Sequence, residues 1–163
     1  VVVILTDVLK AIVAILVSVW LGGLFDPRIL PTTPLENQAM ILVFFKYWGG
    51  LFCLLGHMFP CMFHFKGGKG ILSGGTIAIM IDWRIALVVW GGFLILAVLT
   101  RYVSLGSCWA GASFPFITWF VYRSVPVTVL AVIIGGLILY MHRGNIHRLL
   151  TGTENKFTLH KKS

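Results

Sequence analysis

The stretch around which this chain is organised reads GHMFPCMFHFKGGKG and runs from Gly56 to Gly70. It lies between two apolar segments, and its last five residues combine three glycines with two lysines. Because glycine tolerates φ > 0, these glycines predict a loop whose N–H groups point toward one anion, with cationic side chains beside it. A phosphate fits such a loop. A Walker A motif is excluded, because it needs Ser or Thr after its lysine and this chain has Gly70 there. From these residues alone, a basic loop that anchors a membrane protein to lipid headgroups fits equally well.

The composition is that of a membrane protein. The chain has 163 residues, of which 58% are hydrophobic and 11% charged, and its mean hydropathy is +0.96. A soluble domain has about 25% charged residues. Spans of about 20 residues use most of this length. We therefore expect a single integral-membrane domain over residues 1–163.

The charge balance and the cysteines narrow the function further. The net charge is +8, with 13 basic and 5 acidic residues, which indicates a cytoplasmic face that meets anionic lipids or anionic substrates. The basic residues are scattered between apolar segments, so we expect no nucleic-acid partner. The three cysteines lack the spacing of a disulfide framework or a zinc site. We expect neither a metal ion nor a cofactor.

The apolar pattern predicts an all-α, polytopic transmembrane helix bundle of about six spans. They cover residues 1–24, 40–55, 71–81, 85–99, 105–122 and 125–141. The third is too short to cross alone, so it borrows from its neighbours or is a tilted or broken helix. We expect Lys46 to lie near the end of the second span and Pro115 to interrupt the fifth. Asp7 and Lys10 share a helical face, where they either neutralise each other or support a polar site.

The distribution of positive charge predicts the orientation. With the C-terminal tail inside, the inner face carries the larger group of cations, namely Lys66, Lys69, Arg101, Arg143, Arg148, Lys156, Lys161 and Lys162. The outer face carries Arg28, Arg84 and Arg123. Since membrane proteins keep the lysine and arginine excess inside, the glycine loop and the tail are predicted to be cytoplasmic.

A second polar cluster, HRGNIHRLLTGTE, begins where the sixth span ends and runs from His142 to Glu154. In a continuing helix, His142 and Asn145 share a face. The predicted topology puts this cluster on the same side as the glycine loop, which suggests one shared site. A juxtamembrane basic patch held by headgroups is the alternative, although such a patch has no need of Asn145, Gly152 or Glu154.

These two motifs closely resemble two of the three motifs of the bacterial acyl-phosphate:glycerol-3-phosphate acyltransferases. The segments DVLK (Asp7–Lys10) and TRYVSLGS (Thr100–Ser107) resemble secondary stretches of that family. The resemblance implies an enzyme of seven spans in the bacterial inner membrane. Such an enzyme transfers an acyl group from acyl phosphate to the 1-hydroxyl of glycerol 3-phosphate, giving lysophosphatidic acid and phosphate in phospholipid synthesis. The implied partners are these two substrates and membrane lipids.

The resemblance also implies roles for particular residues. The glycine loop would bind glycerol 3-phosphate through Gly67, Gly68 and Gly70 with Lys66 and Lys69 beside them. His142 and Asn145 would be the essential catalytic pair, and Glu154 would support the structure. Arg143 would help to neutralise phosphate, and His57 would be structural or would orient a phosphate. The general base is either His142 or a phosphate of the substrate.

The chain departs from the family pattern at its N-terminal side. The family's first motif, a Ser/Gly/Asn-rich loop ending in arginine, and the span before it do not occur in the sequence, and Ile71-Leu72-Ser73 replaces the more usual Val-Ala-Thr. We therefore expect the chain by itself to have little or no catalytic activity. The alternative reading is a non-catalytic transporter or lipid-binding protein with an anion site, although no internal repeat of the kind typical of transporters is visible.

Overall fold

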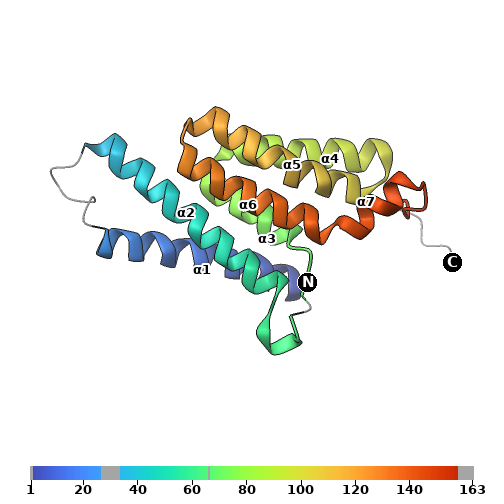
Figure 1. Ribbon diagram of the computed structural model, residues 1–163, viewed down its shortest axis with the longest axis horizontal. Helices are drawn as coiled ribbons and strands as arrows, with labels where there is room; N and C mark the ends of the chain where they lie inside the picture. The colour runs from blue at the N-terminus through green and yellow to red at the C-terminus, as the bar shows by residue number, and fades with distance from the viewer. Residues whose placement is uncertain (1, 27–33, 66, 158–163) are drawn as a thin grey trace.

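The structure is a computed structural model that describes residues 2–26, 34–65 and 67–157 (Figure 1). Over these ranges the chain forms helices joined by turns, as the sequence predicts. In chain order they are α1 (Val2–Phe25), α2 (Leu35–Met58), the 3₁₀ helix η1 (Cys61–Phe63), α3 (Ile71–Ile81), α4 (Trp83–Thr100), α5 (Val103–Tyr122), α6 (Val125–Met141) and α7 (Arg143–Leu150).

The long helices pack as neighbouring pairs. Helix α1 packs along α2, α4 along α5, and α6 contacts both α2 and α5. In Figure 1 the blue-to-cyan pair α1 and α2 lies on one side of α6, and the yellow-green α4 and the yellow-to-orange α5 lie on the other. The core between them consists of buried aliphatic side chains with Tyr47, Met58 and Phe114.

Helix α3 is a short buried helix at the centre of this arrangement. Its 11 residues end where the sequence predicts, and it contacts α1, α2 and α4. The helix does not continue into Asp82, because that residue has an extended backbone. Asp82 instead caps α4 by accepting a hydrogen bond from the Arg84 N–H at 2.8 Å. At 1.5 Å per residue, α3 is about 16 Å long, roughly half of a bilayer's apolar thickness.

Two sequence predictions about single residues are wrong. Helix α2 begins at Leu35, so Lys46 lies in its middle, and its ammonium group contacts the carbonyl oxygen of Ile81 at 3.4 Å. Pro115 does not interrupt α5, which runs through it. A proline in a helix removes one N–H and leaves the carbonyl four residues earlier without its donor. That carbonyl belongs to Gly111, and it faces Gly135 of α6, where two glycines let the helices approach closely.

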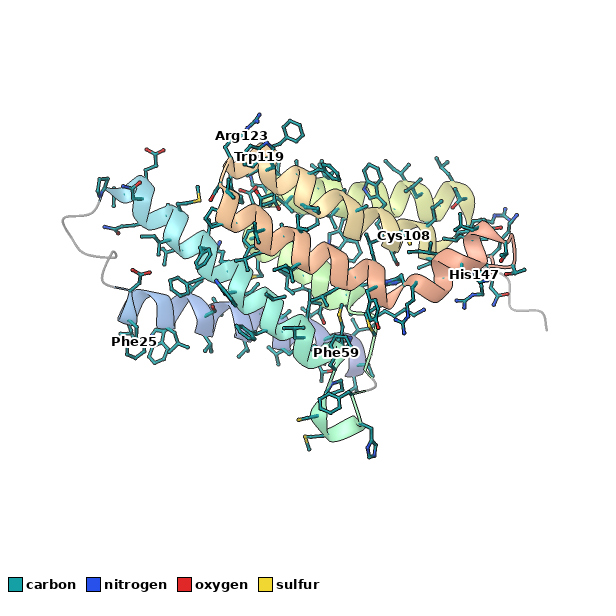
Figure 2. The ribbon with its side chains drawn as sticks, viewed as in Figure 1. Phe25, Phe59, Cys108, Trp119, Arg123 and His147 are labelled. Atoms are coloured by element: carbon teal, nitrogen blue, oxygen red, sulfur yellow. The ribbon has the colours of Figure 1, made fainter. Side chains whose placement is uncertain are left out.

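The bundle has two different ends. At one end, Arg123 closes α5 in a left-handed conformation, and its guanidinium lies over the Trp119 ring at 5.9 Å (Figure 2). His147 of α7 lies at the opposite end. There the chain bends by 61° between α6 and α7, so the predicted continuing helix is broken at His142.

Three of the described helices, α1, α2 and α4, are long and apolar enough to cross a membrane. Helices α6 and α7 would add a fourth span if the bent pair is counted as one. Over the described residues, all six segments predicted as spans are helical, but α3 is short and α6 has 17 residues.

Candidate active site

One polar cavity of about 620 Å³ opens at the α7 end of the bundle. It gathers residues from the starts of α1, α3 and α5, the ends of α2 and α6, helix α7, and the segment after α7. The polar side chains that line it are Asp7, His57, Lys69, Ser104, Ser107, His142, Asn145, Glu154, Asn155 and Lys156. The two motifs singled out in the sequence therefore face one space.

The glycine loop lies against the end of α2, and it differs from the anion nest predicted above. The Gly67 N–H donates to the Met58 carbonyl at 3.1 Å, and the Gly68 N–H donates to the His57 carbonyl at 3.2 Å. These two donors therefore satisfy the last carbonyls of α2, and they do not point at a common guest. A Cβ on Gly67 would collide with the same two carbonyl oxygens, which explains why only glycine fits.

The loop also closes on the His57 ring. A Cβ on Gly68 would collide with His57 Nε2 and lie 2.7 Å from Cε1. Gly70 then takes a left-handed conformation, with φ of +74°, and starts α3. Only a residue without Cβ adopts this conformation without steric cost.

The start of α3 is a candidate anion site next to the loop. Gly70, Ile71 and Leu72 line the cavity, and no side chain caps this end of α3. The first N–H groups of a helix have no partner inside it, and they carry the positive end of the helix dipole. Such an end, with Lys69 beside it, favours a phosphate or carboxylate.

A chain of hydrogen bonds joins the glycine loop to the second motif. Lys69 Nζ donates to Asn145 Oδ1 at 2.6 Å, and Asn145 Nδ2 donates to Glu154 Oε1 at 2.7 Å. Arg148 Nε donates to the other oxygen, Glu154 Oε2, at 2.7 Å. Asn145 is buried, so the carboxylate fixes its amide with the oxygen turned toward Lys69.

Glu154 is held as a carboxylate by these donors. The Asn145 amide, the Ser104 hydroxyl and the Arg148 guanidinium lower its pKa to about 2 from the usual 4.5, although desolvation acts the other way. Only 9% of its side chain is exposed. A well-paired carboxylate of this kind orders the segments that contribute its partners, here α7 and the turn after it.

His142 sits in the bend between α6 and α7 and is 3% exposed. Its Nδ1 lies 2.8 Å from the Ile138 carbonyl oxygen, which can only accept, so the proton is on Nδ1 and Nε2 carries a lone pair. Burial, and then the charge of Lys69, lower the His142 pKa below its usual value. The ring is therefore a neutral acceptor at the cavity wall.

Not every predicted site residue reaches this cavity. The Arg143 guanidinium turns back on its own helix, where Nη1 donates to the Tyr140 carbonyl at 2.9 Å and the group lies over the Tyr140 ring at 4.3 Å. Gly67 lines a neighbouring cavity of about 630 Å³ together with Lys10. Lys66 lies outside the described residues.

The sequence analysis did not select two serines that line the cavity. Ser107 donates to the Val103 carbonyl at 3.1 Å, whereas the buried Ser104 hydroxyl lies near the Glu154 carboxylate and helps to lower its pKa. They are three residues apart at the start of α5 and so share its face. Their spacing, on the same predicted membrane side as both motifs, is the signal that would have identified them.

This arrangement is suited to holding an anion beside a neutral base. Lys69 and the start of α3 supply positive potential, and His142 Nε2 supplies a proton acceptor. Among the described residues, no group of three histidine, cysteine, aspartate or glutamate side chains could hold a metal ion. The chemistry these residues support is transfer between a phosphate-bearing substrate and a nucleophile that must lose a proton.

Comparison with known proteins identifies the family. The profile of the family described as Glycerol-3-phosphate acyltransferase matches residues 1–152. The chain is 40% identical over 138 residues to the glycerol-3-phosphate acyltransferase of Aquifex aeolicus, 40% over 108 residues to that of Fusobacterium nucleatum, and 34% over 151 residues to that of Thermosynechococcus vestitus. These matches cover 82%, 66% and 92% of this chain, respectively. The chain spans between 56% and 67% of the length of these three relatives.

The fold is shared with a solved structure of this kind. The chain resembles the crystal structure of PlsY (YgiH), an integral membrane glycerol 3-phosphate acyltransferase, in its glycerol 3-phosphate form, with a TM-score of 0.62 and 26% identity. The match covers 94% of this chain and 96% of the other. A structure in the lysophosphatidic acid form gives the same score. The all-α, multi-pass membrane fold expected from composition is thereby confirmed, and so is the expected ancestry: this chain belongs to the glycerol-3-phosphate acyltransferase family.

Proposed function

We propose that this chain carries the catalytic site of an enzyme that transfers an acyl group from acyl phosphate to the 1-hydroxyl of glycerol 3-phosphate, giving lysophosphatidic acid and phosphate. The observation that carries the proposal is the single cavity lined by both Lys69 and His142, because it puts an anion site and a proton acceptor in one space. Two crystal structures of a similar protein, one in the glycerol 3-phosphate form and one in the lysophosphatidic acid form, support the substrate and the product.

Phosphate binding is assigned to Lys69 and the start of α3. The lysine reaches the cavity already oriented by Asn145 at 2.6 Å, so less side-chain freedom is lost when an anion binds. The helix dipole adds to the attraction, and both act inside a partly enclosed space where charges are screened less than in water. Arg143 does not line the cavity, and we leave it out of the binding set.

The reaction needs no covalent enzyme intermediate, because acyl phosphate is already activated. The 1-hydroxyl oxygen attacks the acyl carbonyl carbon and forms the ester C–O bond. The bond between that carbon and the phosphate oxygen breaks, and phosphate leaves with the electron pair. The site contributes chiefly by holding the two reactants together and by stabilising their negative charge.

The hydroxyl proton has two possible acceptors. His142 Nε2 carries a lone pair, because Nδ1 donates to the Ile138 carbonyl, and the lowered pKa keeps the ring neutral near pH 7. The substrate phosphate, with a second pKa of about 6, is the other acceptor. We favour His142, because its orientation is fixed by the protein before the substrate arrives.

Asn145 and Glu154 complete the site from α7 and the turn after it. Asn145 turns its amide oxygen toward Lys69, and Glu154 holds that amide in place. In this scheme Asn145 positions the phosphate-binding lysine, and Glu154 acts as the structural support. A site shared by the loop and the segment after α7 supports one membrane face for both. We assign that face to the cytoplasm from the lysine and arginine excess.

The test is acyl transfer from synthetic palmitoyl phosphate to radiolabelled glycerol 3-phosphate by purified protein in detergent. Two proteins are compared. One is the 163-residue chain alone, and the other is a chimera in which the N-terminal segment of the Aquifex aeolicus relative precedes this chain. We expect transfer by the chimera and little by the printed chain, which lacks the family's first motif.

The variant Lys69→Met should raise the KM for glycerol 3-phosphate about 10- to 100-fold, since a hydrogen bond to a charged group contributes about 1.5–3 kcal/mol. Lys46→Met is the matched control, because Lys46 contacts the Ile81 carbonyl and does not line the cavity. Equal effects of the two substitutions, or a chimera that binds glycerol 3-phosphate without transferring an acyl group, would overturn the proposal.

A further inference from the structure

His57 stands between the substrate cavity and the neighbouring one. Its side chain and Gly68 line both, whereas Lys10 lines only the neighbouring cavity and Asp7 only the substrate cavity. Helix α1 therefore reaches the glycine loop through two charged side chains that lie near the same edge of one imidazole, at His57 Nδ1. The proposed function gives the Asp7–Lys10 pair no role so far.

The contacts within this group are short and specific. Lys10 Nζ lies 2.6 Å from Asp7 Oδ1 and 2.5 Å from His57 Nδ1. The distance from His57 Nδ1 to Asp7 Oδ1 is 3.7 Å, which is too long for a hydrogen bond. The lysine thus bridges the carboxylate and the ring, and the carboxylate does not bond the ring itself.

This geometry fixes where the imidazole carries its proton. A lysine ammonium group has three donors and no acceptor, so the atom that it contacts must accept. His57 Nδ1 therefore carries the lone pair. A neutral imidazole with a lone pair on Nδ1 has its proton on Nε2, because the bond made by one ring nitrogen sets the state of the other. An imidazolium would put an N–H against the ammonium group and is excluded by the same contact.

The Nε2–H group remains available for a ligand. Within the part of the chain that the structure describes, Nε2 has no hydrogen-bond partner, and it is not one of the fully buried unpaired atoms. The side chain is 17% exposed, and Nε2 lies over Gly68, next to Lys69. This nitrogen is on the opposite edge of the ring from Lys10.

We infer that Lys10, held by Asp7, fixes His57 as the Nε2–H tautomer and thereby makes it a neutral hydrogen-bond donor to the substrate phosphate. The phosphate part rests on the proposed function, whereas the tautomer does not. Asp7 and Lys10 are positioning residues in this scheme. His57 and His142 then have opposite tautomers: His57 offers a proton from Nε2, and His142 offers a lone pair there.

The tautomer is read directly by two-bond ¹H–¹⁵N NMR of histidine ring nitrogens, on the full chain in detergent micelles at pH 7 without ligand. The His57 signals are assigned by their loss in His57→Gln. We expect the Nε2–H pattern in the wild-type chain and in Lys10→Arg, which keeps a donor, and a mixture of tautomers in Lys10→Met. The Nδ1–H or imidazolium pattern in the wild-type chain would overturn the inference, whatever the protein's activity.

The donor role is read by titrating the same sample with glycerol 3-phosphate. We expect the His57 Nε2 signal to shift in the wild-type chain, and the KM of the chimera for glycerol 3-phosphate to rise about tenfold in Lys10→Met with rescue by Lys10→Arg. The control is Lys46→Met, which should change neither the shift of the His57 Nε2 signal nor the KM for glycerol 3-phosphate. Shifts at Lys69 and Gly70 without one at His57 would overturn the donor role and leave the proposed function intact.

Discussion

Replacing Gly68 with alanine tests whether the glycine loop must touch the His57 ring. The added Cβ would lie 2.7 Å from His57 Cε1 and still closer to Nε2, well inside van der Waals contact. Gly68 is not in the left-handed region, so the cost is steric and the backbone itself adds none. The ring must move, and its contacts with Lys10 move with it.

The size of the effect follows from these contacts. Overpacking of this kind costs about 1–3 kcal/mol, which for a chain of this length lowers the apparent Tm by about 2–12 °C. Displacement of the ring would also remove the hydrogen bond that we propose from His57 to the phosphate. Since such a bond is worth about 1.5 kcal/mol, the KM for glycerol 3-phosphate should rise about tenfold, with a smaller change in kcat.

Gly56→Ala provides the matched control, because it adds the same atom at a glycine twelve residues earlier in the chain. A Cβ on Gly56 has no atom within 4 Å, and the residue lies inside α2. Alanine is favoured over glycine in a helix by about 0.5–1 kcal/mol, so this variant should be as stable as the parent or more so. The assays are thermal unfolding in detergent and acyl transfer by the chimera. A folded Gly68→Ala protein whose KM equals that of Gly56→Ala would refute the packing argument.

Three further predictions concern the rest of the site. Because the Glu154 pKa is lowered to about 2, the stabilising effect of its carboxylate should be present above pH ~4.5 and lost as the pH falls toward 2. The apparent Tm of the parent should therefore drop over that window more steeply than the Tm of Glu154→Gln. Parallel Tm curves for the two proteins would contradict this prediction. Because burial and Lys69 lower the His142 pKa, kcat/KM should stay high down to a pH below the usual ~6.5 for histidine. The variant Lys69→Met should move the acid limb of the pH profile to higher pH. An acid limb that does not move would belong to another group. In a background without the native cysteines, Lys156→Cys should react with a membrane-impermeant thiol reagent from the cytoplasmic side and Arg123→Cys from the other; labelling of both from one side would reject the proposed topology.

The helices themselves were predictable from the sequence. The bounds of α3 and α6 match the apolar runs, and α4 and α5 begin within two residues of the predicted positions. Long apolar runs between charged turns leave few alternatives, because a backbone in lipid must satisfy its hydrogen bonds internally. The start of α2 was missed, since Leu35 to Gln38 is polar enough to read as loop, and that error put Lys46 at a helix end.

The site was only partly predictable. The glycines at 67 and 68 were identified correctly as positions that require glycine, but the reason was wrong: they allow close packing on α2 and His57, and their N–H groups are already bonded. Arg143 was included on charge alone, and its side chain turns to Tyr140. Whether a side chain points into a cavity or along its own helix depends on the neighbouring elements, which sequence spacing does not specify.

The sequence by itself determined the class of the protein: an all-helical membrane chain, with two polar motifs that lie on one face. That much follows from composition and from alternation of spans, because both depend only on the cost of placing charge and unpaired backbone in lipid. The tertiary structure alone decided which polar atoms meet. Residues 10 and 57, and likewise 69 and 145, are brought into contact by the packing of helices far apart in the chain. Those contacts set the tautomer that we infer for His57 and the direction of the Asn145 amide, because a hydrogen bond is specified by the positions of both partners, and a sequence gives only their identities.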